Sequence, residues 1–116
     1  MSTIIYHNPR CSKSREALEI IKEKGLEPEV KLYLKENPSV DVITSISDKV
    51  ECHITELIRF NESIAKELSL KATDQRSKSE WIQLIAENPI LLQRPIVIHN
   101  NKAVIARPPQ KLLDLF

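Results

Sequence analysis

Cysteine is scarce in this chain of 116 residues, and its scarcity excludes two classes of site. The two cysteines, Cys11 and Cys52, are 41 positions apart, and neither has a second cysteine nearby. This spacing is neither a disulfide framework nor a zinc-binding pattern, so we expect no metal site. In a reducing compartment, a cysteine with unusual neighbours is more often catalytic than structural.

Long hydrophobic runs and a strong net charge are also missing. No segment approaches the run of about 18 apolar residues that crosses a membrane, and the start of the chain lacks the features of a secretory signal. We therefore expect a cytoplasmic protein without membrane contact. A formal net charge of +1 does not indicate nucleic-acid binding. Hydrophobic residues make up 41%, enough for a single domain, which we expect to span residues 1–116.

Acidic residues are absent from two segments at opposite ends of the chain. Residues 1–15 and 88–113 contain no Asp or Glu, whereas 15 of the 16 acids lie between residues 16 and 87. The cations of these acid-free segments are Arg10, Lys13, Arg15, Arg94, Lys102, Arg107 and Lys111. If the segments meet in space, they form a local anion site on a nearly neutral protein. Chance is the alternative, because charge patterning is weak by itself.

Hydrophobic periodicity predicts a β-α-β unit at the start of the chain. We expect a buried strand over residues 3–7, a helix over 12–24 that ends at Gly25, and a strand over 28–34 with Val30, Leu32 and Leu34 on one face. Helices follow. Ser39 can cap one, and the capping box Ser77-Lys78-Ser79-Glu80 begins another.

The last part of the chain predicts a hairpin and a short helix. Strands over 96–98 and 103–105 flank His99-Asn100-Asn101-Lys102, a turn in which Asn tolerates positive φ. Pro108-Pro109 begins the final helix. The predicted fold class is α/β, a thioredoxin-like mixed four-stranded sheet flanked by helices. A helical insertion, at about residues 38–88, separates the β-α-β and β-β-α units.

Cys11 lies where the first strand runs into a helix, among charged neighbours in YHNPRCSKSR. The helix N-terminus, the nearby cations and His7 should lower the thiol pKa below its free value of about 8.5. The same features attract an anion. The alternative is a structural cysteine with His7 as an ordinary strand-end residue.

The segment Cys11-Ser12-Lys13-Ser14 reads C-x-x-S and lacks the second cysteine of a dithiol oxidoreductase. Any disulfide chemistry therefore needs an outside thiol, such as glutathione or a glutaredoxin. The sequence also lacks the C-x5-R loop of tyrosine phosphatases, because the sixth residue after Cys11 is Ala17.

Two arginines near the other end of the chain each precede a proline. Pro95 comes directly before a strand, and in a thioredoxin-like fold this proline is usually cis and faces the helix-start cysteine. Arg94 would then project beside Cys11, and Arg107, at the end of the next strand, could reach the same place. Guanidinium suits a tetrahedral oxyanion because it is planar, always charged and bidentate. The alternative is that both are solvated strand ends.

Three motifs together resemble the glutaredoxin-coupled arsenate reductase family. They are YHNPRCSKSR, LQRPIV and ARPP, in the same order and with similar spacing. The resemblance implies a thioredoxin-like fold and reduction of arsenate to arsenite. It also implies glutathione as co-substrate, glutaredoxin as partner, and no bound metal or organic cofactor.

The resemblance also implies roles for individual residues. Cys11 is the nucleophile that attacks arsenic, and His7 lowers its pKa. Three arginines bind the oxyanion, namely Arg59, Arg94 and Arg107. The residues with supporting roles are Asn8, Ser14, Arg15 and Pro95.

Other interpretations remain open at this point. Cys11 could act as a monothiol on glutathionylated thiols, or the chain could be a non-enzymatic regulator of the same fold that binds RNA polymerase. Ser14 in place of a second cysteine weakens the redox-switch form of the regulator. Cys52 could be a resolving cysteine, but packing on the insertion is the simpler interpretation. We expect His99 to be a turn residue and Trp81 to lie in the core.

Overall fold

The structure, a computed structural model, describes residues 3–116. Residues 1 and 2 lie outside the described residues. They are part of the segment from which we expected no secretory signal. A mixed four-stranded sheet has the order β2-β1-β3-β4. Strand β1 is parallel to β2 and antiparallel to β3, and β3 is antiparallel to β4. The strands are β1 (Thr3–Tyr6), β2 (Glu29–Lys31), β3 (Ile96–His99) and β4 (Lys102–Ile105). This arrangement confirms the predicted fold class.

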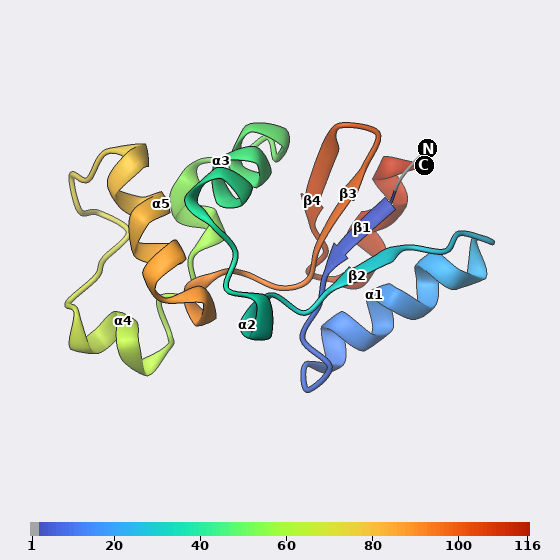
Figure 1. Cartoon of the computed structure of the whole chain (residues 1–116), viewed down its shortest axis with the longest axis horizontal. Coiled ribbons are helices and arrows are strands. Elements are labelled where there is room, and N and C mark those ends of the chain that lie inside the picture. Colours follow the sequence, from blue (N-terminus) through green and yellow to red (C-terminus); the bar gives the residue numbers. More distant parts are fainter. Residues whose placement is uncertain (1–2) are drawn as a thin grey trace.

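Helical segments connect and flank the strands (Figure 1). The α-helices are α1 (Ser12–Glu23), α2 (Tyr33–Glu36), α3 (Val40–Lys49), α4 (Ser63–Glu67) and α5 (Lys78–Glu87). The 3-10 helices are η1 (Ile54–Leu57), η2 (Pro89–Leu91) and η3 (Pro109–Leu115). Figure 1 shows α1 beside the sheet and α3, α4 and α5 grouped at the other end of the molecule. No helix in residues 3–116 is both long and apolar enough to cross a membrane.

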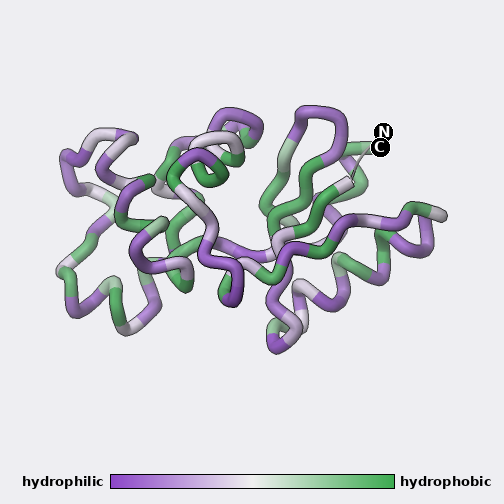
Figure 2. Tube along the Cα trace, viewed as in Figure 1, coloured by the Kyte–Doolittle hydropathy of each residue, from purple (hydrophilic) through white to green (hydrophobic). Residues whose placement is uncertain are grey.

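The sheet separates two hydrophobic clusters because side chains alternate between its faces. Ile5 of β1 and Val97 of β3 belong to a small cluster with α1 and η3. Tyr6 and Ile96 belong to a larger cluster that includes the buried side chains of α3 and α5. Figure 2 shows the hydrophobic colour along the inner strands and hydrophilic colour on the hairpin loop. The larger cluster therefore joins the helices at 33–91 to one face of the sheet.

Local signals fix several element boundaries as predicted. Ser39 Oγ accepts a hydrogen bond from the Val42 N–H at 3.2 Å and caps α3. Ser77 and Glu80 form the reciprocal capping box of α5. Trp81 of that helix is 1% exposed, as expected of a core residue. Gly25, with φ of +79°, ends α1 in the left-handed region that glycine adopts without strain.

The predicted strand over residues 28–34 is wrong in its length and in its buried face. β2 ends at Lys31, and the chain then forms α2 from Tyr33. Val30 and Leu34 are 40% and 38% exposed, whereas Tyr33 is 1% exposed. The reason is that β2 is an edge strand, and α2 turns Tyr33 rather than the leucines into the core.

His99 is not a turn residue. It is the last residue of β3, is 8% exposed, and its Nδ1 lies 2.8 Å from Thr3 Oγ1 of β1. The turn itself is formed by Asn100 and Asn101, whose φ values of 50° and 67° confirm the predicted positive-φ pair.

Candidate active site

Cys11 is the N-cap residue of α1, at the end of a short loop that follows β1. Asn8 shapes this loop with two acceptors. Its carbonyl oxygen accepts from the Cys11 N–H at 2.9 Å, and its side-chain oxygen accepts from the Arg10 N–H at 3.1 Å. The loop therefore holds the thiol directly over the unpaired N–H groups of the first turn of α1.

Ser14 connects this loop to the thiol. It is fully buried, and its hydroxyl oxygen accepts from the Asn8 N–H at 3.4 Å. Partial burial opposes ionisation of Cys11, but hydrogen bonds from the Ser14 N–H, the Arg94 guanidinium, the Ser14 hydroxyl and the Lys13 N–H outweigh it. Together they lower the pKa of Cys11 from 9.0 to about 7, so a substantial fraction is thiolate at neutral pH.

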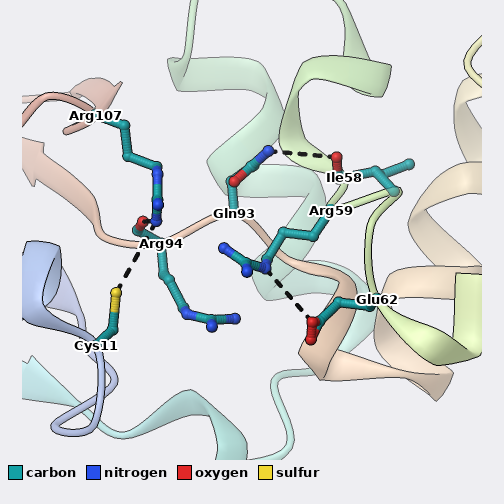
Figure 3. Close-up of polar contacts among 7 residues, drawn as sticks. All are labelled: Cys11, Ile58, Arg59, Glu62, Gln93, Arg94 and Arg107. Atoms are coloured by element: carbon teal, nitrogen blue, oxygen red, sulfur yellow. Dashed lines mark hydrogen bonds and ion pairs between the residues drawn. The ribbon is translucent and has the colours of Figure 1, made fainter.

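Arg107 approaches the thiol from the end of β4. Its Nη1 donates to the carbonyl oxygen of Arg94 at 2.8 Å and lies 4.0 Å from the Cys11 sulfur, a long contact (Figure 3). Both Arg-Pro peptide bonds, Arg94-Pro95 and Arg107-Pro108, are cis. The first agrees with the expectation for Pro95, whereas no sequence pattern indicates the second.

Arg59 reaches the same place from the helical part of the chain. Its backbone N–H donates to the Leu91 carbonyl oxygen at 2.7 Å, and the Gln93 N–H donates to the Leu57 carbonyl oxygen at 2.7 Å. This short antiparallel pairing sets Arg59 beside the segment that carries Arg94. Burial and the charge of Arg94 lower the pKa of Arg59, and its Nε lies 3.8 Å from Glu62 Oε2.

Three guanidinium groups therefore converge beside the thiol. Figure 3 shows Arg59, Arg94 and Arg107 pointing toward one space next to Cys11. The Nε and Nη1 atoms of Arg94 are buried without a hydrogen-bond partner in residues 3–116, whereas the buried Nε of Arg59 forms the ion pair with Glu62. Unpaired, buried donors of positive charge form a site that an anion can satisfy.

Tyr33 is a site residue that the sequence analysis missed. Burial raises the pKa of its hydroxyl, and the charge and close approach of the Arg94 guanidinium, followed by the charge of Arg59, oppose that rise. No contact of this hydroxyl within the described part of the chain has the geometry of a full hydrogen bond. The sequence analysis predicted a strand over residues 28–34 with the leucines on the buried face. Side chains alternate along a strand, so this prediction placed Tyr33 on the opposite face.

His7 is 6% exposed at the end of β1, and its Nδ1 has no partner among the described residues. Burial, followed by the charges of Arg15 and Lys22, lowers the pKa of His7, so its ring is neutral at pH 7. His7 was expected to lower the thiol pKa, but it is not among the residues that donate hydrogen bonds to Cys11.

The Arg15 guanidinium donates to the Pro9 carbonyl oxygen at 2.8 Å. Arg15 therefore stabilises the loop before α1 and does not contribute to the anion site.

A cleft of about 370 Å³ lies on the Arg59 side of the site. It is lined by Ile58, Arg59, Phe60, Asn61, Gln93 and Arg107. A larger cavity of about 450 Å³ has Cys52 as one of its lining residues and does not include Cys11 or the three arginines. No group of three His, Cys, Asp or Glu side chains suited to a metal ion occurs within residues 3–116.

Cys52 differs from Cys11 in its surroundings. Burial, together with the negative charge of Glu56, raises the pKa of Cys52, so its thiol is protonated at neutral pH. It contacts the larger hydrophobic cluster, as expected of a packing residue. The two cysteines therefore form a natural pair for experiments, one activated and one inert.

Comparison with known proteins supplies the remaining context. A protein-family model described as the ArsC family matches residues 6–115. The chain is 41% identical to an arsenate reductase of Haemophilus influenzae, over 99% of both chains. It is 45% identical to the uncharacterized protein YfgD of Escherichia coli, over 96% of this chain and 93% of YfgD. The structure of an arsenate reductase from Vibrio cholerae superposes with a TM-score of 0.94 and 38% identity, covering 100% of this chain and 98% of that one.

Proposed function

Because the chain belongs to the ArsC family, whose model matches residues 6–115, we propose that it reduces arsenate to arsenite. Glutathione is the co-substrate and glutaredoxin the protein partner. The observation that carries the proposal is the set of unpaired Arg94 donors beside a thiol whose pKa is lowered to about 7. A nucleophile and an oxyanion site share one location, as arsenate reduction requires.

The reaction starts when the Cys11 thiolate attacks arsenic in bound arsenate. One oxygen leaves as water, and a thiol ester of As(V) forms. Glutathione adds its sulfur to arsenic as a second oxygen leaves as water. A glutaredoxin thiol then attacks the glutathione sulfur, and the electron pair of the broken sulfur–arsenic bond reduces arsenic to As(III). Hydrolysis of the remaining Cys11–arsenic bond releases arsenite and the free thiol. The two electrons come from two thiols, which leave as a mixed disulfide.

The arginines hold the oxyanion and offset the charge that develops on it. Arg94 supplies two free donors, Arg107 bridges the site to the Cys11 sulfur, and Arg59 brings charge from the opposite side. A fixed arrangement of guanidinium groups stabilises negative charge in the transition state without reorganising. Gln93 holds the Arg59 side together through its backbone hydrogen bond to Leu57.

Other parts of the proposal concern the remaining site residues and the setting. His7 acts as a neutral hydrogen-bonding group, Asn8 and Ser14 position the thiol, and Arg15 and Pro95 support the loops around it. We propose that the protein works in the cytoplasm without a bound metal or organic cofactor, and without a nucleic-acid or membrane partner.

The experiment is a coupled assay with arsenate, glutathione, glutaredoxin, glutathione reductase and NADPH. We expect arsenate-dependent NADPH oxidation that is lost in Cys11→Ser and retained in Cys52→Ser. The second variant is the matched control, because Cys52 carries the same atoms outside the site. No turnover by folded wild-type protein, with each coupling component verified, would contradict the proposal.

The same assay separates the reductase from a monothiol oxidoreductase acting on glutathionylated thiols. That activity needs Cys11 but no oxyanion site. Arg94→Ala and Arg107→Ala should therefore lose arsenate reduction. Equal activity of these variants toward arsenate would contradict the proposed role of the two arginines in binding the oxyanion.

A further inference from the structure

Tyr33 is one of the largest fully buried side chains in the protein, yet its polar atom is left unpaired. The residue is 1% exposed, and its hydroxyl has no hydrogen-bond partner in residues 3–116. Most buried tyrosine hydroxyl groups find a partner, because burial without one costs free energy that water would otherwise recover. An unpaired buried hydroxyl in a folded protein therefore calls for an explanation, and a bound ion is one of them.

The surroundings of Tyr33 show what that partner would be. The charges that act most strongly on the Tyr33 hydroxyl are those of Arg94 and Arg59, followed by that of Cys11. All three residues belong to the proposed site, and the buried donors Nε and Nη1 of Arg94 are themselves unpaired. The Tyr33 hydroxyl, on α2, and the Nε and Nη1 atoms of Arg94 are thus buried donors that lack an acceptor.

We propose that the Tyr33 hydroxyl is a fourth donor to the oxyanion bound beside Cys11. This role rests on the proposed function, because it needs the anion that the arginines hold. A tetrahedral oxyanion presents several acceptor oxygens, more than the guanidinium groups of one side can cover. A neutral phenol adds a hydrogen bond without adding positive charge to a site where three guanidinium groups already repel one another.

The position of Tyr33 in the chain fits this role. It begins α2, and α2 contacts η2, the segment that leads to Arg94. The hydroxyl is thus fixed by the packing of its ring in the larger hydrophobic cluster. Because burial raises the pKa of Tyr33, the hydroxyl keeps its proton at neutral pH and remains a donor.

The test is the affinity for arsenate in Tyr33→Phe, measured by titration calorimetry without glutathione or glutaredoxin, so that the reaction cannot be completed. We expect the Kd to rise about tenfold, the loss of one hydrogen bond to a charged ligand. Tyr6→Phe is the matched control. Its ring also lies against the larger cluster, but the charged groups around it are Lys31, Glu29 and Glu36. Its Kd should equal that of wild type.

A second measurement separates a ligand contact from a structural role. The hydroxyl has no partner in the free protein, so Tyr33→Phe should unfold at a temperature no lower than wild type. A lower unfolding temperature with an unchanged Kd would assign Tyr33 to structure and overturn the proposal. An unchanged Kd in Tyr33→Phe alongside weak binding in Arg94→Ala would overturn the role of Tyr33 and leave the oxyanion site intact. No binding by wild-type protein would overturn both.

Discussion

Arg107 Nη1 donates a hydrogen bond of 2.8 Å to the carbonyl oxygen of Arg94. One guanidinium group is thus fixed to the backbone of the residue that carries another. The same nitrogen lies 4.0 Å from the Cys11 sulfur, so a single atom relates the thiol to the proposed oxyanion site. Position 107 therefore requires the shape of a guanidinium group, and not only its positive charge.

Arg107→Lys should lower kcat/KM for arsenate about 10- to 100-fold, although the charge is kept. An ammonium group cannot reproduce the planar fork that spans the Arg94 carbonyl and the substrate. The coupled NADPH assay measures the change. Arg76→Lys is the matched control, because the Arg76 guanidinium lies over the Trp81 ring, 5.5 Å from its centroid, outside the site. Similar losses in both variants would contradict a specific role for Arg107.

Arg59→Ala should raise the KM for arsenate about tenfold and leave the pKa of the Cys11 thiol close to 7. Arg59 contributes charge to the anion, but the hydrogen bonds that lower the thiol pKa come from Ser14, Arg94 and Lys13. Steady-state kinetics and thiolate absorbance measure the two effects. A thiol pKa that rises in parallel with KM would show that Arg59 acts on Cys11 and not on the substrate.

The thiol of Cys11 should titrate near pH 7, measured by the pH dependence of its alkylation rate in Cys52→Ser protein. Ser14→Ala and Arg94→Ala should each raise this pKa, because each removes a hydrogen bond to the thiolate. His7→Ala should shift it less than either, since the His7 ring is neutral at this pH. A larger shift in His7→Ala would restore the role that the sequence suggested for this residue.

Folding stability should depend on pH through Cys11. Its pKa is lowered from 9.0 in the unfolded chain to about 7 in the folded protein, so the thiolate stabilises the fold. That contribution is fully present above pH 9 and is lost as the pH falls through 7. The free energy of unfolding of wild type, minus that of Cys11→Ala, should therefore increase from pH 7 to pH 9 in urea titrations. A difference that stays constant or decreases over this interval would contradict the lowered pKa.

Local signals in the sequence predicted most of the element order. The capping residues Ser39 and Ser77, the positive-φ pair Asn100-Asn101 and the glycine after α1 act over a few residues, and each is where the sequence indicated. The predicted strand over residues 28–34 is wrong in its length and in its buried face. The alternation of apolar residues does not show that an edge strand ends early, nor that the following helix buries Tyr33.

The sequence by itself determined the chemistry at Cys11. A thiol at the start of a helix, within C-x-x-S and close to cations, is a property of neighbouring residues, and the motif resemblance extended it to Arg59, Arg94 and Arg107. Only the tertiary structure decided how Arg59 is brought to that site, and it added Tyr33, which no sequence pattern indicated. Arg59 arrives through hydrogen bonds between residues 57–59 and 91–93, and Tyr33 arrives because α2 contacts η2. Contacts between segments more than 30 residues apart leave no local periodicity in the sequence, so they become visible only once the chain is folded.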